Sequence, residues 1–194
     1  MAVVAGDLRS GKIVVVSHCL LNVHSLEDGL AEYRGCEEEF LRTLIEEGVG
    51  IFQLPCPEME ISHISRAPLP KDSYDHPAIR ERYRELAGRI VSRLKQFAEK
   101  GYKIVAVIGA EASPTCGISI VGKWKDPEKR GKFPEDVEFV KGMGVFMEEL
   151  RGELGKVGIS TRWVGLPGKT LKSIDPETYD KNKVIKRIRE IIRS

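Results

Sequence analysis

Three of the four cysteines stand in short motifs whose residue types could support metal binding or nucleophilic chemistry. They are Cys19 in Ser-His-Cys-Leu-Leu, Cys56 in Pro-Cys-Pro-Glu and Cys116 in Ser-Pro-Thr-Cys-Gly. Their separations are far larger than the paired spacings of zinc ribbons and dithiol redox motifs, and the sequence has no Cys-x-x-Cys pair. In a reducing compartment such thiols are buried packing groups, metal ligands or nucleophiles.

Each of these cysteines follows an apolar run that is typical of a buried strand. The runs cover residues 13–16, 49–54 and 103–109 and are rich in β-branched side chains. Apolar residues at helical spacing predict helices over residues 36–47, 77–100, 134–154 and 176–192. A fourth strand is predicted over residues 159–164. Segments 20–34, 59–76 and 122–136 lack such spacing and are predicted to be irregular.

This alternation predicts an α/β fold over residues 1–194 as a single domain. We expect a mainly parallel, Rossmann-like sheet of about four or five strands with helices on both faces. Ligands of such folds bind outside the carboxyl ends of the strands. The sequence therefore predicts a site at the carboxyl ends of the first three strands, where Cys19, Cys56 and Cys116 meet.

Three converging thiolates could hold zinc with a fourth ligand, or an iron–sulfur cluster with one iron free of protein ligands. The spacing of the cysteines does not choose between these sites. Cys36, at the start of a predicted helix, or His18, next to Cys19, could supply a fourth ligand.

The three cysteine motifs, in this order, resemble those of the family that includes bacterial 2-thiouracil desulfurase. The resemblance covers about the first two-thirds of the chain. It implies an α/β domain in which Cys19, Cys56 and Cys116 hold a [4Fe-4S] cluster whose free iron receives the sulfur of a thiolated substrate. It also implies catalytic roles for Glu58 and Ser113: Glu58 would take a proton from the attacking water, and Ser113 would orient that water or relay the proton.

The sequence departs from the family pattern after the first cysteine. Asn22-Val23-His24-Ser25 stands where the family usually has Gly and then an Arg-Tyr-Asp-Gly-like run, and Thr115 stands where Ser is common. These departures indicate a divergent branch. Arg66-Ala67-Pro68 resembles the segment that follows the family's second cysteine. The candidate substrate-binding residues are His18, Asn22, His24, Arg66 and Glu111.

Composition restricts the classes of partner. The formal net charge is +2 and 31% of residues are charged, so acidic and basic residues are interspersed without the excess typical of nucleic-acid or membrane-surface binding. No apolar run approaches the ~20 residues of a membrane span, and no signal-peptide pattern opens the chain. We therefore expect a cytoplasmic protein with a small thiolated substrate, no nucleic acid polymer and no membrane. The oligomeric state, a homodimer included, stays open.

The leading hypothesis is an iron–sulfur-dependent desulfidase that removes sulfur from a thiolated nucleobase or thioamide. The alternative is an α/β protein that binds a small molecule or nucleotide, with structural zinc or no metal. No glycine-rich phosphate loop follows any predicted strand, which disfavours the nucleotide-binding version. A third hypothesis, a hydrolase with Cys116 activated by His18 or His24, leaves the equivalent positions of Cys19 and Cys56 unexplained.

Overall fold

The centre of the molecule is a four-stranded parallel sheet with the strand order β2-β1-β3-β6. The computed structural model describes residues 6–129, 131–168, 171 and 179–194. The strands are β1 (Lys12–Val16), β2 (Gly50–Gln53), β3 (Lys103–Ala110) and β6 (Arg162–Leu166). The predicted α/β class and parallel sheet are confirmed. The fourth strand begins three residues later than the predicted range 159–164.

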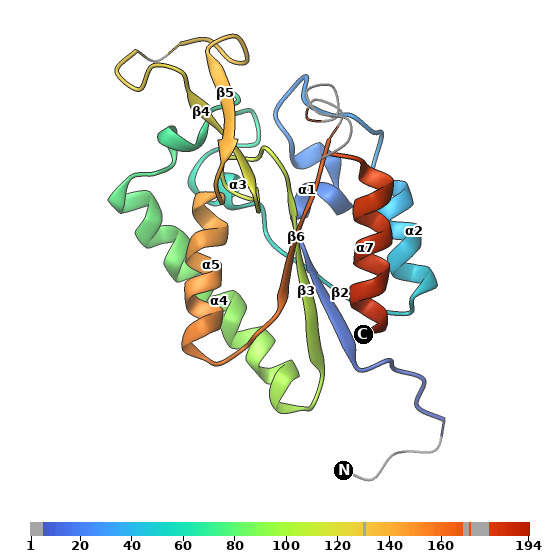
Figure 1. Cartoon of the computed structure of the whole chain (residues 1–194). Helices are drawn as coiled ribbons and strands as arrows, with labels where there is room; N and C mark the ends of the chain where they lie inside the picture. Colours follow the sequence, from blue (N-terminus) through green and yellow to red (C-terminus); the bar gives the residue numbers. More distant parts are fainter. Residues whose placement is uncertain (1–5, 130, 169–170, 172–178) are drawn as a thin grey trace.

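Helices cover both faces of this sheet, as predicted (Figure 1). One face carries α4 (Pro77–Glu99) and α5 (Val145–Lys156), and the other carries α2 (Glu38–Glu46) and α7 (Lys181–Arg193). The start predicted for the last helix, at residue 176, lies outside the described residues. Asp180 caps the described helix by accepting the N–H groups of residues 182 and 183.

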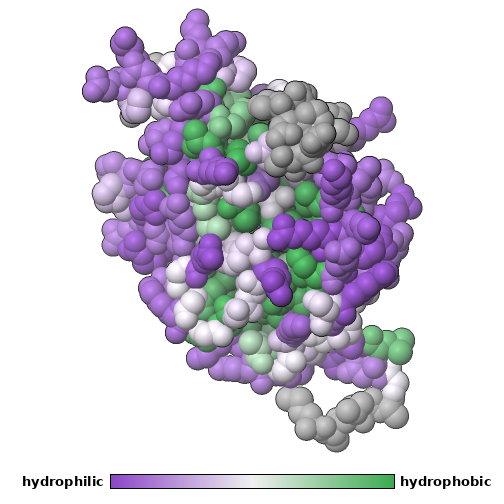
Figure 2. Space-filling view, in the orientation of Figure 1, coloured by the Kyte–Doolittle hydropathy of each residue, from purple (hydrophilic) through white to green (hydrophobic). Residues whose placement is uncertain are grey.

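Side chains on the two faces of the central strands pack into two separate apolar cores. Val15 and Val107 pack with α4 and α5, whereas Val14 and Ile108 pack with α2 and α7. Burial on both faces explains why these strands read as continuous apolar runs. Figure 2 shows hydrophilic side chains over the outer sides of both helical layers and apolar side chains between the layers.

Two short helices begin directly after the first two strands. Helix α1 (His18–Leu21) follows β1, and α3 (Pro57–Ile61) follows β2, with Pro57 in its first turn. Further short turns of 3-10 helix occupy Val23–Ser25 and Lys71–Ser73. The predicted irregular segments 20–34 and 59–76 therefore contain more local structure than their sequences indicate.

The prediction for residues 122–154 was wrong in part. An antiparallel hairpin of β4 (Ile120–Trp124) and β5 (Val137–Lys141) replaces the start of the predicted loop and the first part of the predicted helix, and the described residues between the two strands are irregular, as predicted (Figure 1). Val, Phe and Val within β5 favour a strand. The helix begins only after Gly144, where a Cβ atom would collide with the backbone of Thr115. No helix in the described part of the chain is long and apolar enough to cross a membrane.

Candidate functional site

A cavity of ≈ 550 Å³ lies beyond the carboxyl ends of β1, β2 and β3. Its wall includes α1, α3, the loop after β3, residues of the β4–β5 hairpin and the region around the start of α7. Apolar side chains form a large part of the wall; they include Leu26, Leu30, Leu69, Phe133, Phe139 and Leu166. Size and lining are typical of a small-molecule site.

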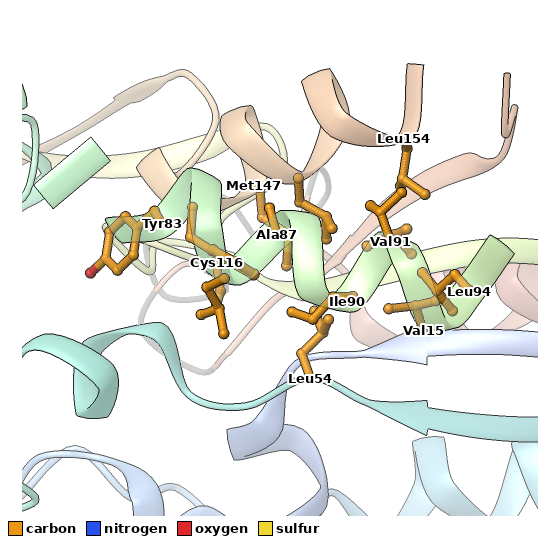
Figure 3. Packing of buried hydrophobic residues seen from close by; sticks show 14 of the residues in the cluster. Val15, Leu54, Tyr83, Ala87, Ile90, Val91, Leu94, Cys116, Met147 and Leu154 are labelled. Carbon is orange, nitrogen blue, oxygen red and sulfur yellow. The ribbon is translucent and has the colours of Figure 1, made fainter. Parts of the chain in front are cut away.

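Three cysteines from three different strand ends line this cavity. Cys19 lies in α1, Cys56 is the N-cap residue of α3, and Cys116 lies in the loop after β3. Figure 3 shows Cys116 among the buried side chains that pack between the sheet and α4. Cys36 is half-buried and is not among the residues that line the cavity.

The three thiols share one electrostatic environment. Burial raises the pKa of Cys19 to about 12, and the nearby Cys56 and Glu58 add to the shift. Burial, followed by the charges of Cys19 and Cys56, raises the pKa of Cys116 well above its ordinary value. The thiols therefore favour the protonated form near pH 7 unless a cation stabilises the thiolates. In the part of the chain that the structure describes, no three His, Cys, Asp or Glu side chains are grouped to hold a single metal ion.

More contacts stabilise the thiolate form of Cys56 than that of Cys19 or Cys116. Burial raises the pKa of Cys56 and the charge of Glu58 adds to the rise, but backbone N–H groups of Met59 and Glu58 hydrogen-bond to the sulfur and oppose it. Arg66 Nη2 lies 3.7 Å from the Cys56 sulfur and adds positive charge. These contacts favour the thiolate form at this corner of the cavity.

Glu58 is buried in the same cavity and is held by three side chains. Its Oε2 accepts hydrogen bonds from Arg66 Nε at 2.9 Å and from the Tyr74 hydroxyl at 3.2 Å. Its Oε1 accepts one from the Thr115 hydroxyl at 2.9 Å. Arg66 is only 5% exposed in its side chain, so the Arg66–Glu58 ion pair is shielded from water.

Ser113 is linked to Glu58 through Thr115. The Ser113 hydroxyl oxygen accepts the backbone N–H of Cys116 at 3.0 Å and lies 3.4 Å from the Thr115 hydroxyl oxygen. Thr115 donates its own proton to Glu58, so it can accept one from Ser113. The first turn of α5 fixes this loop, because Val145 N–H and Met147 N–H donate to loop carbonyls.

Glu27 is a second buried carboxyl in the cavity. Its Oε1 lies 3.3 Å from Arg66 Nε, the nitrogen that also contacts Glu58. Burial raises the pKa of Glu27 to about 8, and a hydrogen bond and like charge from Glu58 add to this shift. Near neutral pH the protonated form of Glu27 is therefore favoured. We call Glu27 and Glu58 the carboxyl pair.

The family of the chain follows from a comparison with known protein families. The family described as "Putative 2-thiouracil desulfurase" matches residues 11–138, which include all three cavity cysteines. The chain belongs to this family. An uncharacterized protein of Methanocaldococcus jannaschii is 30% identical over 186 residues, which is 96% of this chain and all of that relative. Among solved structures, a [4Fe-4S]-dependent thiouracil desulfidase, TudS, is 19% identical, with 78% of this chain and 90% of TudS covered and a TM-score of 0.44.

Only some of the predicted substrate-binding residues lie at the cavity. His18, Arg66 and Glu111 line the cavity, whereas Asn22 and His24 do not. Asn22 and His24 are exposed. The Asn22 side chain caps the 3-10 turn by accepting the His24 N–H.

Like Arg66, the other two cavity-lining candidates already have protein partners. His18 Nδ1 lies 3.3 Å from the carbonyl oxygen of Leu54. The Glu111 carboxylate accepts the backbone N–H groups of Ile118, Ser119 and Ile120 and so holds the segment before β4.

Three functional candidates emerge only from the structure: Glu27, Tyr74 and Thr115. Thr115 was visible in the sequence as a departure from the family pattern, and its contact with Glu58 gives that departure a role. Glu27 and Tyr74 stand in irregular segments, and no local pattern distinguishes them from solvated residues.

Proposed function

We propose that this chain is an iron–sulfur-dependent desulfidase that removes sulfur from a small thiolated compound, such as a thiolated nucleobase or a thioamide. The observation that carries the proposal is that Cys19, Cys56 and Cys116 line one cavity together with Glu58. Membership of the desulfurase family supports the reaction type.

The donor set suits a [4Fe-4S] cluster. Three soft sulfur donors come from three strand ends and border a cavity large enough for a cluster beside a small molecule. Because all three thiols have raised pKa values, loading the cluster must displace protons. When bound through Cys19, Cys56 and Cys116, such a cluster would supply a Lewis acid with affinity for the substrate sulfur.

Glu58 is the proposed base for the attacking water. Its Oε1 has Thr115 as its hydrogen-bond partner and retains a lone pair for a water molecule. Water adds to the thiocarbonyl carbon and gives a proton to Glu58. The carbon–sulfur bond then breaks as the added hydroxyl loses its remaining proton and the carbon–oxygen double bond forms. Sulfur leaves as hydrogen sulfide, which takes up that hydroxyl proton and the proton held by Glu58. Ser113 orients Thr115, and Arg66 keeps Glu58 in place.

The competing hypotheses fit the geometry less well. A structural zinc ion needs its ligands around one point, and the described residues contain no such group. A Cys116 nucleophile needs a lowered pKa, whereas burial raises it. In the described part of the chain, the His18 ring hydrogen-bonds to the carbonyl oxygen of Leu54 and not to the Cys116 thiol, and His24 lies outside the cavity.

Anaerobic reconstitution with iron and sulfide tests the cofactor. We expect about four irons per chain and a brown protein, and loss of this iron in Cys116→Ala. Cys36→Ala is the matched control and should retain the iron, because Cys36 does not line the cavity. A wild-type protein that retains no iron under these conditions would exclude the proposed cofactor.

Sulfide release tests the reaction. The reconstituted protein should release one sulfide for each 2-thiouracil converted to its oxygen counterpart. Glu58→Gln should bind iron normally but release sulfide on the order of 100-fold or more slowly, the usual loss for a missing general base. Normal turnover by this variant would remove Glu58 from the mechanism.

A further inference from the structure

One buried nitrogen of the Arg66 guanidinium has no partner. Arg66 Nε contacts the carboxyl pair, and Nη2 donates to the carbonyl oxygen of Ser25 at 2.9 Å and lies near the Cys56 sulfur. Nη1 is buried and has no hydrogen-bond partner among the described residues. A buried donor without an acceptor is costly, and in a ligand-binding wall it indicates an acceptor supplied by the ligand.

The contacts of the other guanidinium nitrogens place the Arg66 side chain in the wall of the large cavity. Arg66 also borders a smaller cavity of ≈ 280 Å³ beside Ser62 and Ile79. The residues that the guanidinium contacts all line the large cavity, and none lines the smaller one; they are Ser25, Glu27, Cys56 and Glu58. With its other nitrogens fixed by these residues, the guanidinium cannot turn away at low cost.

We infer that Arg66 is a specificity-determining residue that donates a hydrogen bond from Nη1 to an acceptor atom of the substrate other than its sulfur. The inference rests on the proposed function and narrows the substrate class. A thiolated heterocycle that also carries a carbonyl oxygen satisfies the donor, whereas one whose sole exocyclic acceptor is sulfur leaves it unpaired. The carboxyl pair holds the guanidinium in one orientation, so the choice between substrates depends on geometry as well as on charge.

Binding to iron-free protein tests the inference without turnover. Calorimetry compares 2-thiouracil, which carries a carbonyl, with 2-thiopyridone, which lacks it. We expect wild type to favour 2-thiouracil by roughly 10- to 100-fold, the range for a hydrogen bond to a charged group. Arg66→Lys should reduce this preference to less than about threefold, because an ammonium lacks the planar fork. Arg84→Lys is the matched control: Arg84 pairs with Glu149 outside the cavity and should leave the preference unchanged.

The outcomes separate the inference from the proposed function. Equal binding of the two compounds by wild type would overturn the inference, even if Arg66→Lys does not fold. A preference that survives in folded Arg66→Lys would overturn it as well. Sulfide release by iron-loaded wild type reports on the proposed function alone. Discrimination without sulfide release would therefore support Arg66 recognition and refute the desulfidase.

Discussion

The buried carboxyl of Glu27 predicts how the free energy of unfolding depends on pH. Glu27 has a pKa of about 8 in the folded chain against 4.5 for a solvated glutamate. Between these values, the folded protein holds a proton that the unfolded chain lacks. Stability linked to this proton is therefore fully present below about pH 4.5 and is lost as the pH rises toward 8. Glu27→Gln has the shape of the protonated side chain and should abolish this dependence.

The size of the effect follows from the number of protons involved. One linked proton gives a slope of at most roughly 1 kcal/mol or slightly more per pH unit. Between pH 5.5 and 7.5, the free energy of unfolding of wild type should fall by about 2 to 3 kcal/mol relative to Glu27→Gln. This figure is an upper bound, because the slope is full only where Glu27 is wholly protonated in the folded chain and wholly ionised in the unfolded chain.

Urea unfolding of iron-free protein at pH 5.5, 6.5 and 7.5, followed by circular dichroism, measures this difference. Subtracting the two proteins cancels the histidines and every other group that titrates equally in both. Glu38→Gln is the control, because its exposed carboxylate pairs with Arg42 on the surface of α2. A difference between wild type and Glu27→Gln that stays constant across this pH range would refute the proton held by Glu27 in the folded chain.

Two further substitutions test how the third cysteine loop is held. Thr115→Val should lower the free energy of unfolding by about 1 to 3 kcal/mol because it removes the hydroxyl that Glu58 accepts, whereas Thr115→Ser should recover most of the loss; equal losses in urea titrations would contradict this. Gly109→Ala should destabilise by about 1 to 3 kcal/mol, because a Cβ there collides with the Cys116 carbonyl oxygen. Gly152→Ala, in an open position of α5, should instead stabilise the protein by roughly 0.5 to 1 kcal/mol. If thermal melts do not show a lower melting temperature for Gly109→Ala and a higher one for Gly152→Ala, the crowding assigned to Gly109 is refuted.

The sheet could be predicted from the sequence because its central strands are buried on both faces. Burial of every residue from 13 to 16 and from 104 to 109 leaves an apolar run with few other interpretations. The carboxyl ends of these runs then placed the cysteine loops at one edge. The hairpin was missed because β5 (Val137–Lys141), although its Val and Phe residues favour a strand, alternates weakly and leads into glycines beside a helix.

The carboxyl pair could not be predicted because its contacts join distant, irregular segments. Glu27 and Glu58 meet through Arg66. Glu27 and Arg66 lie in segments without hydrophobic periodicity, and Glu58 lies in the short helix α3. The sequence predicted separate roles for Glu58 and Arg66 through family motifs, but no motif relates either residue to Glu27. Only the folded chain shows that one guanidinium nitrogen serves both carboxyls.

Arg66 also makes the three cysteine corners of the cavity unequal. It places positive charge 3.7 Å from the sulfur of Cys56, and backbone N–H groups of α3 reinforce that effect. Cys19 and Cys116 have no such cation beside them in the described part of the chain, and the charge of each thiolate opposes that of its neighbours. The Arg66 guanidinium and these N–H groups therefore partly oppose the rise in pKa that burial causes at Cys56, whereas the neighbouring charges at Cys19 and Cys116 add to it. A bound cation would favour the thiolate form at all three corners.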